Sequence, residues 1–431
     1  MHSVFPDSPL KEEAFAIARE AVAASLPDEA VRRALAELAP AKGKTVAVAV
    51  GKAAWPMAQA AARALEGRLD AGYVITKYGH AQGELPGFQV FEAGHPQMDE
   101  NGVRATRAVL EAVSALAAED RVLFLLSGGG SALMEAPLLP FAELQDINAQ
   151  LLACGANIVE INAQLLACGA DIVEINTIRK RLSAVKGGKF ARACAPAEVV
   201  SIILSDVVGD RADAIASGPA CPDTSTAQEA LEIARKYNLR LSEAAWELLR
   251  AEPVRELPNA RAMVTGGVGQ LCRAALEACA RRGYEAELLT DCLCCEAREA
   301  GTFLGCVARA HAGQGRKRAF VAGGETVVYL KGRGKGGRNQ EMALAAAQQI
   351  AGLKGVAVLA LGSDGTDGPT DAAGGVVDGE SRALLEAQGL RIPAILDEND
   401  AYEGLKACDG LLITGPTGTN VNDVSLVLIG G

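Results

Sequence analysis

Residues 121–134 read RVLFLLSGGGSALM, and this stretch decides the kind of fold that the chain adopts. A short apolar run ends at Ser127, three consecutive glycines follow, and a helix-forming segment begins near Ser131. A buried strand that leads through a flexible turn into a helix is the building unit of a parallel α/β sheet. The glycines are compatible with a tight turn that needs positive φ. Three in succession also let backbone N–H groups turn toward one anion, as in phosphate-binding loops. We therefore predict that a phosphate-containing cofactor binds at Ser127, Gly128, Gly129, Gly130 and Ser131.

The composition of the chain is that of a globular α/β protein. Its 431 residues are 49% hydrophobic and 22% charged, with 47 glycines and few aromatics. This length favours two or three domains. The net charge of −11 comes without any basic run, so nucleic acid and anionic membrane surfaces are poor candidate partners.

The sequence also indicates a cellular compartment. No apolar run reaches the length of a membrane span, and the first residues lack a signal-peptide pattern. Eleven cysteines, an odd number, indicate reduced thiols. The cluster Cys292, Cys294 and Cys295 has neither a C-x-x-C step nor a nearby histidine pair, which argues against a metal site there. We expect a cytoplasmic protein, monomeric or homodimeric, that acts on a small molecule.

The strand–turn–helix pattern recurs along the chain. Residues 45–50 (TVAVAV) form a buried strand pattern before a turn and a helix, and similar apolar runs begin near residues 71, 88, 198, 260, 285, 318, 356 and 423. A polar, proline-containing stretch at 251–259 separates two such series. We predict a Rossmann-like three-layer N-terminal domain with a mostly parallel sheet over 1–250. A smaller α/β domain with a mixed sheet is predicted over 251–431.

One segment is repeated. Residues 147–160 (INAQLLACGANIVE) and 161–174 (INAQLLACGADIVE) differ only at Asn157 and Asp171. Two copies are too few for a solenoid, so the repeat reads as a tandem duplication. We expect one copy to keep its place in the fold and the other to be accommodated as extra helical turns or a surface loop.

Two further stretches of the N-terminal half carry candidate site residues. Lys52 follows the strand at 45–50 at the start of a helix, where the helix dipole disfavours a cation. It is therefore a candidate ligand for phosphate or carboxylate. Asp206 follows the apolar strand at 198–204, and a carboxylate beside a phosphate loop suits Mg²⁺. Asp210 and Asp213, close behind, are explained equally well as helix caps.

The C-terminal half contains two glycine-rich stretches with charged residues. In GGETVVYLKGRGKGGRNQEM, Glu325 follows a strand and is a candidate substrate contact. Arg338 lies near a helix start, where its guanidinium can fork onto a phosphate or carboxylate. Asn339 comes next and is a candidate substrate contact. In LGSDGTDGPTDAAGG, Asp364, with Asp367 and Asp371 behind it, indicates a loop that contacts substrate or metal. A plain Asx-rich turn is the alternative.

A competing pattern suggests a dinucleotide site. The segment 260–291 reads as strand, Gly267-Val-Gly269, helix, strand and then Asp291. This is the layout of a Rossmann dinucleotide unit, although Cys272 stands at its third glycine position. A nicotinamide-dependent reductase is therefore an alternative to phosphoryl transfer.

Together the motifs resemble one family. VGKAAWPMA, LLSGGGSAL, INTIRKRLSAVKGGKFA, LSDVVGDRADAIASGPACPDTST, GGRNQEMALA and SDGTDGPTDAAGG are similar, in this order from about Phe15 onward, to the type II glycerate kinases. This glycerate 2-kinase family includes members that carry an older hydroxypyruvate reductase label. The duplicated unit departs from the family pattern, which has one copy before INTIRK, and so bears on the positions of Arg179, Lys180 and Lys186.

The resemblance implies a function and roles for several residues. It implies two α/β domains with an active cleft between them, where ATP and Mg²⁺ phosphorylate D-glycerate to 2-phosphoglycerate. It also implies that Lys52 and Arg338 contact substrate or phosphate. We expect Asp206 and Asp364 to serve as metal ligand or general base, without an assignment between the two roles. A hydroxypyruvate reductase and a non-catalytic sugar-phosphate-binding regulator are the alternative functions.

Overall fold

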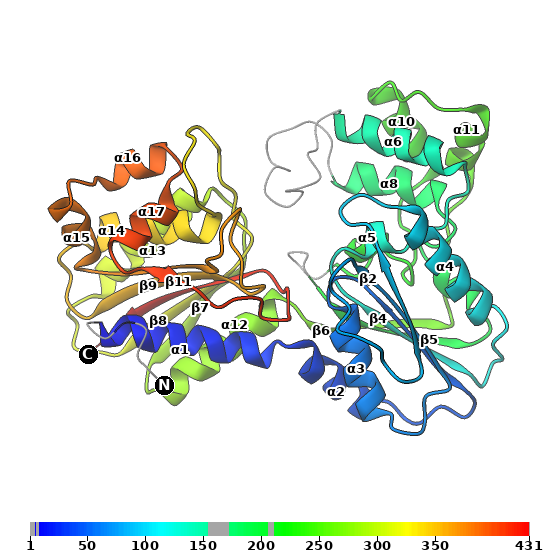
Figure 1. Cartoon of the computed structure of the whole chain (residues 1–431), viewed down its shortest axis with the longest axis horizontal. Helices are drawn as coiled ribbons and strands as arrows, with labels where there is room; N and C mark the ends of the chain where they lie inside the picture. The colour runs from blue at the N-terminus through cyan, green and yellow to red at the C-terminus, as the bar shows by residue number, and fades with distance from the viewer. Residues whose placement is uncertain (1–4, 6–7, 154–171, 206–210, 431) are drawn as a thin grey trace. The chain divides into compact units, whose positions relative to one another are not determined.

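A computed structural model describes residue 5 and residues 8–153, 172–205 and 211–430. The chain forms two compact units, residues 27–265 and residues 1–26 with 266–431 (Figure 1). The sequence predicted a division near 251–259. In the structure the division lies after residue 265, because the strand at 260–266 joins the first sheet. The N-terminal helix packs on the second unit.

The first unit is built on a six-stranded sheet with the order β3-β2-β1-β4-β5-β6. This is the strand order of the dinucleotide-binding Rossmann sheet. The pairs among β1 to β5 are parallel, as predicted. In chain order the strands are β1 (Thr45–Val50), β2 (Ala71–Lys77), β3 (Phe88–Ala93), β4 (Arg121–Leu126), β5 (Glu198–Leu204) and β6 (Ala260–Gly266).

Helices cover both faces of this sheet because its strands are apolar on both sides. All six residues of β1 are buried, which is typical of a central parallel strand. One face packs on α2 (Pro27–Ala36) and α3 (Ala54–Ala64), and the other on α4 (Glu100–Val113), α5 (Gly130–Leu133) and α9 (Lys189–Ala193).

A separate helical layer belongs to the same unit. It has its own apolar core, which includes Leu144, Ile178 and Leu249. Its elements are α6 (Phe141–Ala153), α8 (Ile172–Leu182), α10 (Ala227–Lys236) and α11 (Glu243–Arg250), while the 3₁₀ helix η2 (Ile215–Ser217) contacts α5 and α8. The first repeat begins within α6 and the second ends within α8. The expected place of the extra copy lies outside the described residues.

The second unit has a mixed sheet, as predicted, with the order β11-β10-β9-β12-β8-β7. Only β7 and β8 pair in parallel, and the other pairs are antiparallel. The strands are β7 (Glu285–Leu293), β8 (Arg318–Gly324), β9 (Val356–Gly362), β10 (Gly374–Asp378), β11 (Leu411–Leu412) and β12 (Asp423–Ile429). The sequence analysis had no strand at β10 or β11.

Two helical layers enclose this mixed sheet (Figure 1). On one face lie α1 (Pro9–Ala24) and α12 (Val268–Arg281). The other face is covered by α13 (Ala297–His311), α14 (Arg338–Ile350), α15 (Ser381–Ala387), α16 (Ile392–Asp397) and α17 (Ala401–Ala407). Among the described helices, none combines the length and apolar composition that a bilayer span requires.

Candidate active site

The glycine loop lies at the carboxyl end of β4, as predicted. Gly129 has a φ of 87°, a left-handed conformation that glycine adopts without strain. The helix behind the loop, α5, has only four residues, so its dipole adds less than the sequence suggested. The amide groups of residues 128–131 donate no hydrogen bond to another residue in the described part of the chain. They are therefore the groups that remain available to an anion.

The turn after β1 holds the loop in place. The Lys52 amide donates to the Gly128 carbonyl at 2.8 Å, and the Ala53 amide donates to Ser127 Oγ at 3.0 Å. Lys52 lies in this turn, two residues before α3 begins at Ala54, rather than inside the helix. Its backbone thus contacts the glycine loop, and its role as a phosphate or carboxylate ligand stays a prediction.

His95, which the sequence analysis did not select, flanks the loop beside Lys52. A Cβ atom on Gly129 would lie 2.9 Å from His95 Cδ2 and Nε2, and 3.3 Å from Lys52 Cγ. Burial, and then the charge of Lys52, lowers the pKa of His95 to about 4. The imidazole is therefore neutral at pH 7 and can donate one hydrogen bond and accept another. The signal in the sequence was one of only four histidines, separated from the strand FQVFEA by a single glycine.

The other side of the loop is formed by α8 and η2. Arg179 Nη2 donates to the Ser131 carbonyl at 3.2 Å. Ser131 Oγ and Ser217 Oγ lie 2.9 Å apart, and Ser217 Oγ donates to Asn176 Oδ1 at 2.9 Å. Ala216 and Ser217 both have positive φ, at 51° and 62°, a strained backbone typical of functional sites. Arg179, one of the residues whose positions depended on the duplication, thus contacts the loop.

A buried ion pair lies directly behind the loop. Lys186 Nζ is 2.5 Å from Glu135 Oε2 and 3.3 Å from the Met134 carbonyl, and the two side chains are 0% and 2% exposed. Burial lowers the pKa of Lys186 to about 8, although the charge of Glu135 opposes this shift. Since Glu135 follows α5 without a break, the pair fixes the end of the segment that carries the glycines.

The predicted metal ligands are not brought together among the described residues. Asp206, with Asp210, lies outside those residues. Residues 8–153, 172–205 and 211–430 contain no group of three or more His, Cys, Asp or Glu side chains that could hold a metal ion. The described cysteines, including Cys292, Cys294 and Cys295, are free thiols.

The second unit contains a charged cluster around Arg338, the first residue of α14. Arg338 Nε and Nη2 donate to the two carboxylate oxygens of Asp423 at 2.5 and 2.9 Å, and Nη1 lies 3.4 Å from Glu325 Oε1. Burial acts to lower the pKa of Arg338, but the charge and hydrogen bonds of Asp423 outweigh it and raise the pKa. Nε and Nη2 are thus hydrogen-bonded to Asp423, and Nη1 is ion-paired with Glu325. Asp423 was seen in the sequence only as the start of a strand.

Asp367 fixes the start of α14 beneath this cluster. Its carboxylate accepts from the backbone amides of Asn339 and Gln340 at 3.2 and 2.9 Å. Burial raises the pKa of Asp367 to about 6, with Arg338 acting in the opposite sense. Asn339 is fully buried against Asp367, a place from which it positions the helix.

Asp364 lies apart from this hydrogen-bonded cluster. Its side chain accepts from the amide and hydroxyl of Thr366, at 2.9 and 3.1 Å. The structure therefore brings together Glu325, Arg338, Asn339 and Asp367 among the residues selected from the sequence. Within the described part of the chain, no hydrogen bond or ion pair joins Asp364 to any of them.

The dinucleotide pattern at 260–291 does not form a dinucleotide unit. That unit requires both strands in one sheet, whereas β6 belongs to the first sheet and β7 to the second. Gly267 and Gly269 lie at the start of α12, and Gly269 lies close to Asp291, since a Cβ there would be 3.3 Å from Asp291 Oδ2. The glycines thus connect two units of the chain.

Comparison with known proteins agrees with this architecture. A domain of unknown function, DUF4147, matches residues 13–164 and 162–250, two segments that meet within the duplicated stretch. The MOFRL family matches residues 318–423. A D-glycerate 2-kinase from Thermotoga maritima is 46% identical over 99% of this chain and 100% of its own. A glycerate 2-kinase from Pyrococcus horikoshii is 38% identical over 90% of this chain and 88% of its own.

A solved structure extends this likeness to three dimensions. The crystal structure of glycerate kinase from Thermotoga maritima has a TM-score of 0.91 and 45% identity, covering 97% of this chain and 99% of its own. The fold, the glycine loop and these matches define a two-unit α/β phosphotransferase. The chain belongs to the glycerate 2-kinase family.

Proposed function

We propose that the chain transfers the terminal phosphoryl group of ATP, bound as its Mg²⁺ complex, to the 2-hydroxyl of D-glycerate. The observation that carries this proposal is the glycine loop, whose amides at residues 128–131 donate no hydrogen bond within the described part of the chain, with the side chain of Lys52 beside Gly129. The loop fits a phosphate because the groups that face it are N–H donors, and a side chain at Gly129 would fill the space.

The proposed chemistry is mainly charge neutralisation. Phosphoryl transfer passes through a loose transition state with charge on the phosphoryl oxygens, so the protein acts by positioning and electrostatics. Lys52 and Arg338 neutralise the substrate carboxylate and the moving phosphoryl group. When bound with ATP, Mg²⁺ supplies further neutralisation of the phosphate oxygens.

The proton of the attacking hydroxyl needs an acceptor. Asp206 and Asp364 remain the proposed carboxylates for this role and for contact with Mg²⁺. Neutral His95, beside the glycine loop, adds a third group that can accept a hydrogen bond at pH 7. Lys52→Ala and Arg338→Ala should each lower kcat/KM.

The test is a kinase assay with the purified full-length chain. D-glycerate, ATP and Mg²⁺ should yield ADP and 2-phosphoglycerate, the latter identified by ³¹P NMR, and EDTA should abolish turnover. NADH with hydroxypyruvate, run in parallel, should show no oxidation. Product at the 3-hydroxyl would correct the regiochemistry. Ligand binding without turnover would replace the proposal by a regulatory one.

Arg338→Ala tests the role of the second unit. The loss of a contact to transition-state charge should lower kcat/KM at least about 100-fold. The matched control is Arg382→Ala, which removes an ion-paired arginine from α15, where Arg382 Nε lies 2.7 Å from Glu386. Near-normal turnover in Arg338→Ala would refute the assigned role.

A further inference from the structure

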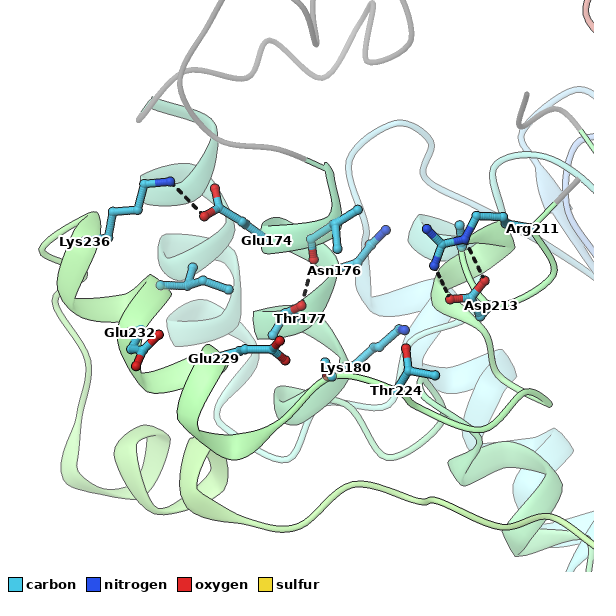
Figure 2. A pocket seen from close by; sticks show the side chains of 14 residues that line it. Glu174, Asn176, Thr177, Lys180, Arg211, Asp213, Thr224, Glu229, Glu232 and Lys236 are labelled. Carbon is cyan, nitrogen blue, oxygen red and sulfur yellow. Dashed lines mark hydrogen bonds and ion pairs between the residues drawn. The ribbon is translucent and has the colours of Figure 1, made fainter. Parts of the chain in front are cut away.

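A cavity of about 480 Å³ lies in the helical layer of the first unit. It is bounded by α8, by α10 and by residues 211–214 and 224–225 (Figure 2). This volume falls in the range of small-molecule sites. Among the described residues, the glycine loop, Lys52, Glu325, Arg338, Asn339 and Asp364 do not line it, so its occupant needs a separate explanation.

The charges around the cavity do not suit a polyphosphate. Four carboxylates line it against three cations: Glu174, Asp213, Glu229 and Glu232 against Lys180, Arg211 and Lys236. The cations are already engaged with acids. Lys236 lies 2.8 Å from Glu174, Arg211 lies 2.7 Å from Asp213, and Lys180 lies 3.4 Å from Asp223. Figure 2 shows Glu174 of α8 reaching Lys236 of α10, with Lys180 directed toward Asp213 and Thr224.

The same lining suits an uncharged ligand with hydroxyl groups. Val173, Ala214 and Ile233 supply apolar surface, which can pack on a flat ring. Carboxylates accept hydrogen bonds from sugar hydroxyls and exocyclic amino groups. Such a ligand has an apolar body and a few polar edges, as a nucleoside does. D-glycerate, by contrast, is a three-carbon anion that would neither fill the cavity nor find an unengaged cation in it.

The cavity is connected to the glycine loop through one wall. Asn176 lines the cavity and accepts from Ser217 Oγ, which in turn lies 2.9 Å from Ser131 Oγ of the loop. From the same helix, Arg179 donates to the Ser131 carbonyl. Two hydrogen bonds therefore separate the cavity wall from the proposed phosphate site.

We propose that this cavity is the nucleoside subsite of the phosphoryl donor. The base and ribose lie between α8 and α10, and the phosphates extend past Asn176 and Ser217 toward residues 128–131. This inference rests on the proposed function, because it assigns the donor's uncharged part to a place beside the proposed phosphate loop.

Val173→Trp tests the subsite by filling it. The Val173 side chain lines the cavity but is about half exposed, at 50%, so the chain can accept the larger ring without repacking its core. The matched control is Arg235→Trp, an exposed position on α10 that does not line the cavity. Glu232→Trp, exposed on α10 and lining the cavity, is a second obstructing variant in case Val173→Trp fails to fold.

The assays separate nucleoside from phosphate and from glycerate. We expect Val173→Trp to raise the KM for ATP, and the Kd of ADP measured by calorimetry, at least about tenfold. A change of this size corresponds to the loss of one favourable contact between the nucleoside and the cavity. The KM for D-glycerate should change less than about twofold, and Arg235→Trp should match the wild type. Adenosine alone should compete with ATP in the wild type and lose this competition in the variant.

Each outcome decides between the two proposals. If the wild type turns over ATP while both obstructing variants keep its ADP affinity, the subsite is refuted and the kinase function stands. A rise confined to the KM for D-glycerate would likewise refute it. If the wild type neither binds ADP nor phosphorylates glycerate, the proposed function itself fails, and the nucleoside assignment fails with it.

Discussion

Removing the amine behind the glycine loop should destabilise the protein strongly, although Lys186 contacts no solvent and no proposed ligand. Lys186→Met leaves the carboxylate of Glu135, 2% exposed, with one hydrogen bond from the described residues, donated by the Ala136 amide at 3.0 Å. A buried charge that loses its partner costs about 3–5 kcal/mol, whereas the removal of both charges is often close to neutral. We therefore expect Lys186→Met to lose about 3–5 kcal/mol of unfolding free energy. The double variant Glu135→Gln with Lys186→Met should recover at least about 2 kcal/mol of that loss.

Urea denaturation, followed by circular dichroism at one pH, compares the wild type, the single variants Glu135→Gln and Lys186→Met, and the double variant. The matched control is Lys406→Met, which breaks an exposed Lys–Glu pair on α17 at 3.6 Å, with side chains 63% and 54% exposed. An exposed pair of this kind contributes less than about 1 kcal/mol. If Lys186→Met costs no more than Lys406→Met, or if the two changes in the pair simply add, the pair does not hold the segment behind the loop.

Two further predictions concern the loop itself. Gly129→Ala places a methyl group 2.9 Å from the His95 ring and should raise the KM for ATP at least about tenfold. Gly79→Ala, with a φ of 77° and open space around it, imposes the same backbone strain of about 1–2 kcal/mol and should leave that KM unchanged. Equal effects in the two variants would remove the steric argument. For His95, a pKa lowered to about 4 in the folded state means that the unfolded chain binds more protons between pH 6.5 and 4. Stability should be complete above pH 6.5 and fall toward pH 4, and His95→Gln should flatten this slope in Tm. An unchanged slope would show that His95 is not held neutral.

The first sheet could be predicted almost strand by strand because its strands are buried on both faces. A run such as TVAVAV or RVLFL has no polar side to solvate, so it identifies a central parallel strand without knowledge of its neighbours. The strands β10 and β11 were not predicted because they are short, and because Gly374 and Gly375 lack the side chains that indicate a strand. The dinucleotide unit predicted at 260–291 was wrong because the strand–glycine–helix pattern does not show which sheet the next strand joins.

Some residues of the candidate site could likewise be predicted from the sequence, and others could not. Lys52, the glycine loop and Arg338 stood out because their residue types conflict with an ordinary strand end or helix start. His95, Arg179 and Asp423 did not, because each acquires its place only when a distant segment packs beside it. Arg338 itself was predicted as a free clamp, whereas Asp423, which lies 85 positions further along the chain, engages its guanidinium.

The sequence by itself determined the local chemistry of this protein: a parallel α/β sheet, glycine turns that leave amides available, and a family of phosphotransferases. These properties follow from neighbouring residues, whose spacing sets burial and backbone freedom. Only the tertiary structure decided which cations are already neutralised, which histidine is held neutral, and where a cavity opens between α8 and α10. Those properties depend on contacts within a few ångströms between segments far apart in the chain, and electrostatic and desolvation energies are set by that proximity.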